Sequence, residues 1–461
     1  MSCELGEFVK AQGGFAFKSK DFGNEGTPVI KIANVTGGGF VDLSSYDCIK
    51  ANLYPRLDDF LTEPDDVLIA MTGANVGKVV RVGKQQPVCA LNQRVARLQL
   101  KEGCKYSKDF FYYLTSSKVG YEYFSSAAYG SAQPNISGSL IEALPIPNIS
   151  PEIANKGASF LRGIDDKIHL NHQINQTLEQ MAWAIFKSWF VDFELVKAKI
   201  AVLEDGGNEE DANLAAMQAI SGKTLVELEQ LKIQSPDHYQ QLHTTAQHFP
   251  AAMQDSALGE IPEGWEIAKI SDFGKVVCGK TPLKKNKEFY NGAIPFIKIP
   301  DTHGKIFITN TLENLSQAGH KSQQNKLLPA GSIGVSCIAT VGQVFITTEP
   351  SHTNQQINSI ILYKQKYSYY LFFKFKGMKD IFHDYASGGS ATLNMNTSTF
   401  SGIFIEKPPV DLTFQFHSAL APLMDRILNN QKESETLESL RDALLPKLLS
   451  GELCVKNQVI A

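Results

Sequence analysis

The chain has 461 residues, of which 43% are apolar and 20% are charged, and its formal net charge is −4. This length predicts two or three domains, and the composition is that of a soluble globular protein rather than a disordered or fibrous one. The sequence has no membrane-spanning apolar run, no secretory leader pattern and no CxxC pair among its seven cysteines, so we expect a cytoplasmic protein without a metal site or disulfides.

The first 150 residues contain short runs of β-forming residues that are separated by glycine and proline. Basic and acidic residues are equal in number here, 15 of each. We predict a first globular domain of mixed α and β structure over 1–150. Its expected strands are 29–35, 67–72, 79–82 and 95–100, and its expected helix is 108–123.

Residues 151–200 predict a long helix, because apolar or small residues recur there at alternating steps of four and three positions. This stripe consists of Ile164, Ile168, Asn171, Asn175, Leu178, Ala182, Ile185 and Trp189. Pro151 stands at the expected start, where proline is tolerated. One face of this helix must therefore be buried against a partner.

The next segment is acidic, because 195–258 holds four lysines and nine acidic residues. Two apolar stretches, at 216–220 and 225–231, indicate helices. We predict a helical connector over 201–258, and its charge would repel the phosphate groups of a nucleic acid.

A second β-rich domain is predicted over 259–410. It holds 16 lysines, no arginine and 11 acidic residues, and this basic excess permits nucleic-acid binding without demanding it. Its expected strands are 333–338, 344–348 and 357–363, and its expected helix is 368–385.

Residues 411–461 predict a second long helix followed by a C-terminal tail. The stripe returns there as Leu423, Ile427, Asn430, Ser434, Leu437, Arg441, Leu444 and Leu448. Each position follows its counterpart in the first helix by 259 residues. Pro446 is expected to disturb the last turns.

The two domains repeat as well. Asn92-Gln93 returns as Asn354-Gln355, Val76-Gly77-Lys78-Val79 as Val341-Gly342-Gln343-Val344, and Gly130-Ser131-Ala132 as Gly389-Ser390-Ala391. The predicted fold is therefore α+β, with two globular α/β-mixed domains, two long antiparallel coiled-coil helices and a pseudo-two-fold internal repeat. The alternative is that each helix packs only on its own domain.

Over its whole length the chain resembles the specificity subunits of Type I restriction–modification systems. The motifs that carry the resemblance are Gly14-Phe-Ala-Phe-Lys-Ser-Lys-Asp-Phe22, the two Pro-x-Ile-Lys-Ile strands, Trp183-Ala-Ile-Phe-Lys-Ser-Trp-Phe190, Ile261-Pro-Glu-Gly-Trp265 and Leu444-Leu-Pro-Lys-Leu-Leu-Ser-Gly451. The first domain has no counterpart of Ile261–Trp265, so we expect either that its opening is short or that its start codon is misassigned.

The resemblance implies that each domain is a target recognition domain that reads one half of a bipartite sequence in double-stranded DNA. It implies that the helices set the unread spacer and bind two modification subunits, which are joined by restriction or motor subunits. S-adenosylmethionine, ATP and Mg²⁺ are expected on these partners, and no cofactor is expected on this chain. We expect an apolar partner-binding face at Trp183, Phe186, Trp189 and Phe190.

A search for catalytic motifs finds none. Gly222-Lys223-Thr224 resembles the end of a phosphate-binding loop, but Met217 stands where that loop needs glycine. No HExxH pattern and no adenine-methylation motif of the Asn-Pro-Pro-Tyr type is present. Asp65-Asp66 is expected to face solvent in a turn rather than to form a catalytic pair.

A reader of duplex DNA needs cations for phosphates and amide or guanidinium groups for base edges. The candidates in the first domain are Lys18, Lys20, Lys31, Thr72, Asn75, Lys78, Asn92, Gln93, Arg94, Tyr129, Ser131, Gln133 and Asn135. Those in the second domain are Lys280, Lys284, Lys285, Lys298, Thr302, His303, Thr340, Gln343, Asn354, Gln355, Gln356, Ser387 and Ser390, with Lys287 in the same basic loop. The alternative for each cluster is an ordinary polar turn.

Three other functions stay open at this point. The chain could carry an enzymatic site of an unfamiliar kind, it could serve a system that only methylates DNA, or it could be a scaffold that binds proteins and reads no DNA.

Overall fold

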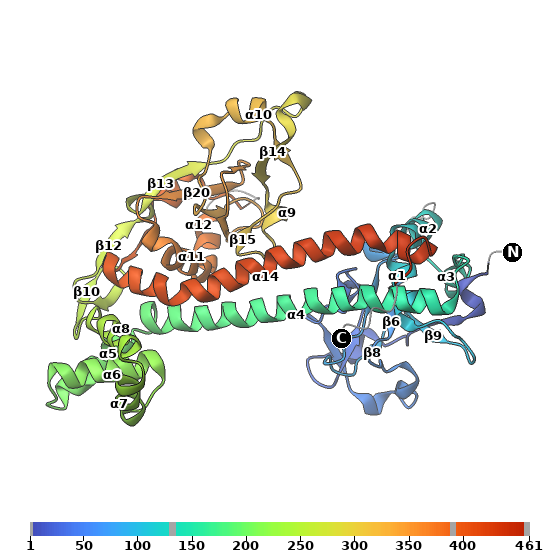
Figure 1. The fold of residues 1–461 in the computed structure, drawn as a ribbon, viewed down its shortest axis with the longest axis horizontal. Coiled ribbons are helices and arrows are strands. Elements are labelled where there is room, and N and C mark those ends of the chain that lie inside the picture. The colour runs from blue at the N-terminus through green and yellow to red at the C-terminus, as the bar shows by residue number, and fades with distance from the viewer. Residues whose placement is uncertain (1–2, 129–134, 388–392, 456–461) are drawn as a thin grey trace. The chain divides into compact units, whose positions relative to one another are not determined.

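The computed structural model describes residues 3–128, 135–387 and 393–455 (Figure 1). The chain divides into two compact units, of which the first contains Met1–Asn171 and Glu433–Ala461 and the second contains His172–Lys432. Helices α4 (Pro151–Phe190) and α14 (Val410–Ser450) each contribute to both units. Among the described residues, no helix combines the length and the apolarity needed to cross a membrane.

The first domain is built on a five-stranded sheet in the order β1-β9-β6-β7-β4. Its strands are β1 (Val9–Gly13), β4 (Gly39–Phe40), β6 (Val67–Ala70), β7 (Val79–Arg81) and β9 (Val95–Leu100). All four residues of the central strand β6 are buried, which accounts for its uniformly apolar sequence. A smaller sheet in the order β2-β5-β3-β8 contains β2 (Phe22–Gly23), β3 (Thr27–Ile30), β5 (Asp47–Ile49) and β8 (Ala90–Leu91).

The described residues of the first domain also form the helices α1 (Lys108–Ser116), α2 (Lys118–Ala128) and α3 (Gly138–Glu142). Phe110 and Phe111 of α1 are fully buried in one core with Val67 and Ile69 of the sheet. The predicted helix 108–123 is therefore two helices, because Ser117 has an extended backbone (φ −60°, ψ 160°) between them.

The second domain is built on a sheet in the order β13-β20-β17-β18-β15. Its strands are β13 (Gly274–Cys278), β15 (Phe307–Ile308), β17 (Ile333–Ser336), β18 (Val344–Thr347) and β20 (Ile357–Leu362). Smaller sheets contain β10 (Met253–Ser256), β11 (Gly259–Pro262), β12 (Glu266–Lys269), β14 (Tyr290–Ile297), β16 (Asn314–Leu315), β19 (His352–Thr353) and β21 (Phe404–Lys407). The helices are α9 (Ile299–Thr302), α10 (Gln317–Lys321), α11 (Ser368–Gly377), α12 (Lys379–Ala386) and α13 (Thr397–Gly402).

The two five-stranded sheets have the same order and the same strand directions. In both, only the last pair is parallel, β7 with β4 and β18 with β15. Val67 pairs with Arg81 in the first sheet as Ile333 pairs with Ile346 in the second. The internal repeat predicted from the sequence is thereby confirmed at the level of register.

Most of the predicted strands are found within one or two residues of the expected bounds. The prediction for 29–35 is wrong in its second half, because β3 ends at Ile30 and Ile32–Asn34 form a 3₁₀ turn. In the described part of the first domain, Glu4 forms a bridge with Pro145, whereas the second domain pairs all four residues of β12 with β21.

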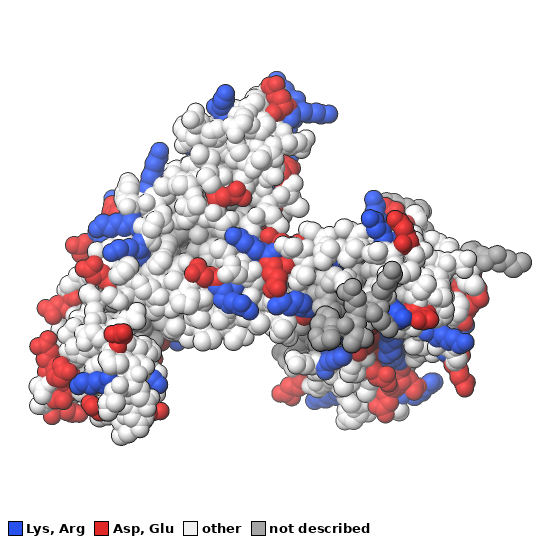
Figure 2. Space-filling model, viewed as in Figure 1, with Lys and Arg blue, Asp and Glu red and all other residues white. Residues whose placement is uncertain are grey.

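The connector consists of the helices α5 (Glu194–Glu204), α6 (Glu209–Ser221), α7 (Leu225–Gln234) and α8 (Pro236–Gln247). Acidic side chains prevail on its visible surface (Figure 2). Gly222 ends α6 with a left-handed φ of 66°, and the Thr224 hydroxyl accepts a hydrogen bond from the amide of Glu227 at the start of α7. The Gly222-Lys223-Thr224 motif is therefore a turn between two helices.

Helices α4 and α14 lie side by side and antiparallel in each unit (Figure 1). In the first unit, Asp165 bonds to Arg441 and Asn171 bonds to Ser434. In the second unit, Asn175 bonds to Asn430. The prediction of paired helices is thus confirmed, and the alternative that each packs only on its own domain is wrong.

The ends of the long helices differ from those expected. Helix α4 ends at Phe190 instead of near residue 200, because Phe193 adopts a left-handed φ of 52° before α5 begins. Helix α14 continues through Pro446 to Ser450, so the predicted disturbance does not end the helix.

Candidate DNA interface

Three turns of the first domain meet at one end of β6. The amide of Met71 donates to the carbonyl oxygen of Arg94 (2.9 Å), and the amide of Ile136 donates to the carbonyl oxygen of Met71 (2.9 Å). Thr72 also forms a bridge with Asn135. The three polar clusters predicted from the sequence, in so far as they are described, therefore share one location.

The second domain repeats this convergence. The amide of Cys337 donates to the carbonyl oxygen of Gln356 (2.8 Å), and the amide of Met395 donates to the carbonyl oxygen of Cys337 (2.9 Å). Ile338 forms a bridge with Asn394, which is exposed. Asn394 was missed in the sequence-based prediction, although it follows Asn135 by the 259 residues that relate the two helices.

In each domain a glycine lies in close contact with the backbone at the turn that carries Asn92–Arg94 or Asn354–Gln356. A Cβ atom on Gly14 would lie 2.2 Å from the carbonyl oxygen of Leu91, and one on Gly279 would lie 2.1 Å from that of Asn354. Only glycine permits such an approach. The turns that carry Asn92–Arg94 and Asn354–Gln356 are thus held closely by a neighbouring backbone.

In the first domain, Gln93 and Arg94 are exposed at the convergence, as is Asn135. Lys78 Nζ donates to Asn75 Oδ1 (2.9 Å), and Asn75 Nδ2 donates to the carbonyl oxygen of Ile32 (2.9 Å). Asn75 and Lys78 therefore stabilise the turn between β6 and β7.

The three remaining candidate lysines of the first domain, Lys18, Lys20 and Lys31, lie on the turns beside the smaller sheet. Lys31 forms an ion pair with Asp47 and lies over the ring of Phe22, 3.7 Å from its centroid. Lys18 and Lys20 are exposed on the 3₁₀ turn before β2, and the amide of Lys18 donates to the Tyr54 hydroxyl (3.3 Å).

In the second domain, Gln355 and Thr340 are exposed, and Gln343 and Gln356 are half-buried. Asn354 is largely buried, and its Nδ2 donates to Gln356 Oε1 (2.9 Å), so it supports the turn. Thr72 is similarly buried in the first domain.

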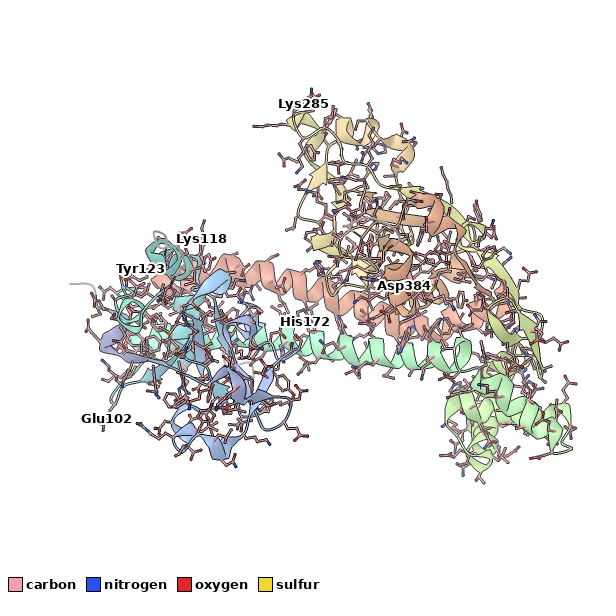
Figure 3. All side chains as sticks on the ribbon, turned by 180° about the vertical axis from the view of Figure 1, so that it is seen from behind. Glu102, Lys118, Tyr123, His172, Lys285 and Asp384 are labelled. Carbon is pink, nitrogen blue, oxygen red and sulfur yellow. The ribbon has the colours of Figure 1, made fainter. Side chains whose placement is uncertain are left out.

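The basic loop before β14 is exposed. Lys285 points outward from the second unit (Figure 3). Lys284 and Lys287 line an open groove of about 340 Å³ with Tyr290, Asn291, Glu313 and Asn314. Lys280 is exposed just before this loop, whereas Lys298 is paired with Glu313. This loop could bind phosphate groups without sequence preference.

Some candidates are not where a contact with DNA requires them. The prediction for Thr302 is wrong, because its side chain is 1% exposed and its hydroxyl donates to the carbonyl oxygen of Ile299 (2.8 Å). His303 and Ser387 are exposed. Tyr129, Ser131, Gln133 and Ser390 lie outside the described residues.

The predicted partner-binding face of α4 is mostly internal. Phe186, Trp189 and Phe190 are 1–3% exposed, so the prediction is wrong for them. They pack in the core of the second unit, where Phe190 lies 4.9 Å from Tyr370 and 4.8 Å from Phe416 between ring centroids.

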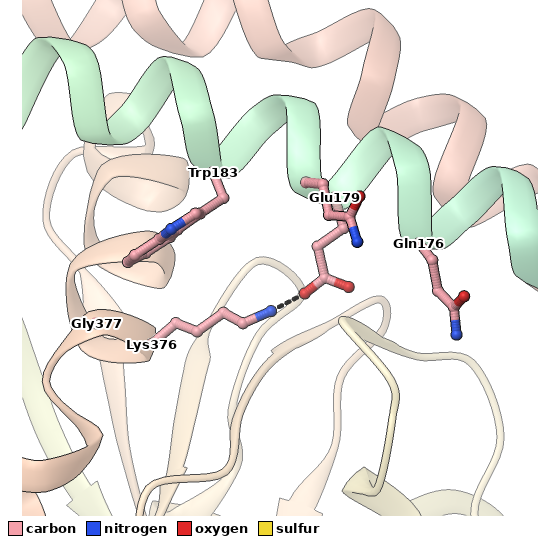
Figure 4. Close-up of a pocket in the computed structure, with 6 residues that line it drawn as sticks. Gln176, Glu179, Trp183, Lys376 and Gly377 are labelled. Carbon is pink, nitrogen blue, oxygen red and sulfur yellow. Dashed lines mark hydrogen bonds and ion pairs between the residues drawn. The ribbon is translucent and has the colours of Figure 1, made fainter. Parts of the chain in front are cut away.

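Of the four residues predicted for this face, only Trp183 is partly exposed to solvent. It lines a groove of about 430 Å³ in which Lys376 of α11 pairs with Glu179 of α4 (Figure 4). A Cβ atom on Gly377 would lie 2.9 Å from the indole ring, so glycine lets α11 approach Trp183 closely.

Asp65-Asp66 also differs from its prediction. Asp66 is buried and receives ion pairs from Arg97 (3.4 Å) and Lys108 (2.9 Å). Asp65 adopts a left-handed φ of 65° and pairs with Arg162 (2.6 Å). The two carboxylates are therefore structural ion-pair partners rather than solvent-facing groups.

Comparison with known proteins relates these features to a family. A model of the family described as "Type I restriction modification DNA specificity domain" matches residues 1–180 and 262–439, which is more than half of the chain. The chain belongs to this family. The unmatched stretch between the two regions contains the connector helices α5–α8.

Individual specificity subunits support the assignment. The chain is 47% identical over 354 residues to the Type I restriction enzyme HindI specificity subunit of Haemophilus influenzae, covering 75% of this chain and 77% of that protein. It is 28% identical over 466 residues to the MjaIX specificity subunit of Methanocaldococcus jannaschii, covering 95% and 93%.

The fold also has a solved relative. The Type-I restriction-modification system S subunit from M. genitalium superposes with a TM-score of 0.53, covering 99% of this chain and 96% of that one, at 14% identity. This likeness supports the specificity-subunit fold with two α/β-mixed domains and two long helices.

Proposed function

We propose that this specificity subunit reads a bipartite DNA sequence, with one half read by each domain. The observation that carries the proposal is the duplicated convergence of three polar turns, at Met71 and at Cys337, on corresponding strands of two different domains. The amide and guanidinium groups exposed there suit base edges. Because the side chains at the two convergences differ, the two half-sequences are expected to differ.

The α4–α14 pair is proposed to set the number of unread base pairs between the half-sites. A helix advances about 1.5 Å per residue, so an insertion in both helices lengthens the spacer without touching a domain. The exposed faces of the same pair are proposed to bind two modification subunits, and restriction or motor subunits join that complex.

Catalysis is assigned to those partners. The modification subunits would bind S-adenosylmethionine and methylate adenine, and the motor subunits would use ATP and Mg²⁺. This chain would supply no catalytic residue and bind none of these cofactors.

The deciding experiment maps methylated adenines in DNA from cells that express this chain with its cognate modification subunits. A motif of two short specified sequences around an unspecified spacer is expected. A single uninterrupted motif, or methylation that does not depend on this chain, would refute the proposal. The purified chain alone, incubated with DNA and S-adenosylmethionine, should transfer no methyl group.

A further inference from the structure

One buried carboxylate of the first unit holds side chains from three other elements. Asp165 lies on α4, and its side chain is 7% exposed. Its Oδ2 accepts hydrogen bonds from Arg81 Nη2 on β7 (2.9 Å) and from the Tyr113 hydroxyl on α1 (2.6 Å). Its Oδ1 accepts one from Arg441 Nη1 on α14 (3.0 Å). This single side chain therefore ties the first domain to both long helices.

The domain's contribution to this contact is a fully buried cation. The Arg81 side chain has no exposed surface. Its Nη1 donates to Asp109 (3.2 Å), and its guanidinium carbon lies 4.2 Å from the ring centroid of Tyr112. A buried ion is tolerated only where a counter-charge and hydrogen bonds replace water, so Arg81 depends on Asp165 as much as Asp165 depends on it.

The second unit makes the corresponding contact without charge. The strand registers equate Arg81 with Ile346, and the offset of 259 equates Asp165 with Met424 and Arg441 with Ala182. These three counterparts are buried in one apolar core, with exposures of 4%, 0% and 0%. The same place in the repeat is thus ionic in one unit and apolar in the other.

We propose that Asp165 and Arg441 select which recognition domain can be seated on the helices of the first unit. The helix surface around them accepts a domain that carries arginine on the strand equivalent to β7. It rejects a domain that carries an aliphatic residue there, as the second domain does at Ile346. This selection acts through the fit between domain and helices and does not depend on DNA reading.

The selection works in both directions. With the second domain seated in the first unit, Ile346 would face Asp165, and the carboxylate would lose its bonds from Arg81 and Tyr113. With the first domain seated in the second unit, Arg81 would keep its bond to Asp109 but would lose the one to Asp165 and lie buried against Met424. Either exchange leaves a buried charge with too few hydrogen-bond and ion-pair partners. Replacing Arg81, Asp165 and Arg441 together by apolar residues removes the buried charges and therefore the need for such partners.

A cycle of substitutions in the natural chain tests this directly. Arg81→Ile should lower the Tm of the first unit by roughly 5–10 °C, because it leaves Asp165 without its buried cation. Adding Asp165→Met and Arg441→Ala, the residues of the second unit, should recover most of that loss. If the three substitutions lower Tm additively, the proposal is wrong. Arg56, which is exposed, offers the matched control: Arg56→Ile should leave Tm unchanged.

A domain exchange in the full chain gives the second test. Residues 1–150 are replaced by a copy of 259–409, and the chimera is made with and without Asp165→Met and Arg441→Ala. The two helix substitutions should raise the Tm of the chimera and lower the Tm of the natural chain, so that their effect changes sign. Equal effects in both chains, or a chimera that fails to fold even with the substitutions, would overturn the proposal.

Discussion

Asn430 Nδ2 donates a hydrogen bond to Asn175 Oδ1 at 2.9 Å, joining α14 to α4 in the second unit. Its repeat-related contact in the first unit runs from Asn171 Nδ2 to the Ser434 hydroxyl at 3.3 Å. Adding 259 to the numbers of Asn171 and Asn175 gives Asn430 and Ser434. The pair in one unit therefore corresponds to the pair in the other, with α4 and α14 exchanged. Polar side chains at core positions of a coiled coil fix the register, and they do so at some cost in stability.

The asparagine pair yields a prediction about stability. Asn430→Leu should lower the free energy of unfolding by about 1–3 kcal/mol, because the oxygen of the half-buried Asn175 amide then loses this donor. The double variant Asn175→Leu/Asn430→Leu should recover that loss, since two leucines pack as an ordinary apolar layer. Urea denaturation measures both, and Asn429→Leu, at an exposed neighbouring position, is the control. Additive losses in the double variant would contradict this account.

The close approach of glycine to the reading turns predicts effects confined to one half-site. Gly14→Ala should displace the turn at Asn92–Arg94, because the added Cβ overlaps the Leu91 carbonyl oxygen. In the assembled modification complex it should reduce methylation at least tenfold and relax discrimination in the first half-sequence only. Methylation of substrates altered in one half at a time measures this.

The matching change in the second domain is Gly279→Ala, which should relax the second half-sequence and leave the first intact. Gly23→Ala and Gly402→Ala serve as controls, because an added Cβ meets nothing within 4 Å at either site. Loss of both half-sequences from either single change would argue against separate readers.

Lysine in the exposed loop before β14 is expected to contribute affinity without specificity. Lys285→Ala should weaken binding to all duplexes and reduce the slope of log K against log salt by about one, because one phosphate contact is lost. Gln355→Ala should instead relax one position of one half-sequence. Lys197→Ala, in the acidic connector, should change neither. Salt titrations of DNA binding by the complex would show the difference.

The histidine pair of the second domain predicts a dependence of stability on pH. The pKa of His352 is lowered from 6.5 to about 4, first by burial and then by His320, whose Nδ1 lies 3.0 Å from its Nε2. Below pH 6.5 the unfolded chain takes up a proton that the folded chain refuses, so stability falls as pH drops from 6.5 towards 4. The Tm of His352→Gln should fall less steeply over this range than that of the natural chain. If Tm fell equally with pH in the natural chain and in His352→Gln, groups other than His352 would cause the loss of stability in acid.

The sequence predicted what depends on periodicity and repetition. The alternating steps through Asn171 and Asn175 predicted paired helices, because a continuous apolar stripe has to be covered. The offset of 259 predicted two similar domains, and the polar turns at 92–94 and 354–356 could be identified from the repeat alone.

Burial by distant elements could not be predicted. Phe186 looked like a docking residue because the local sequence does not show that Phe373 and Phe416 of other helices pack against it. Asp66 follows a proline in a turn, which indicates exposure, but Arg97 and Lys108 draw it into the interior. The meeting of three turns at Met71 depends on sheet order, which local sequence does not specify.

The bond between Asp165 and Arg441 also bears on how such genes can evolve. Codon 165 lies close to the end of the first domain's coding region, whereas codon 441 lies beyond the coding region of the second domain. A single crossover that imports a new first domain can bring its own residue at 165 but retains the resident residue at 441. Newly acquired domains that keep an arginine on the β7 equivalent therefore have an advantage. Lineages that combine an apolar residue at that position with a charged helix surface are expected to carry compensating changes in the C-terminal helix.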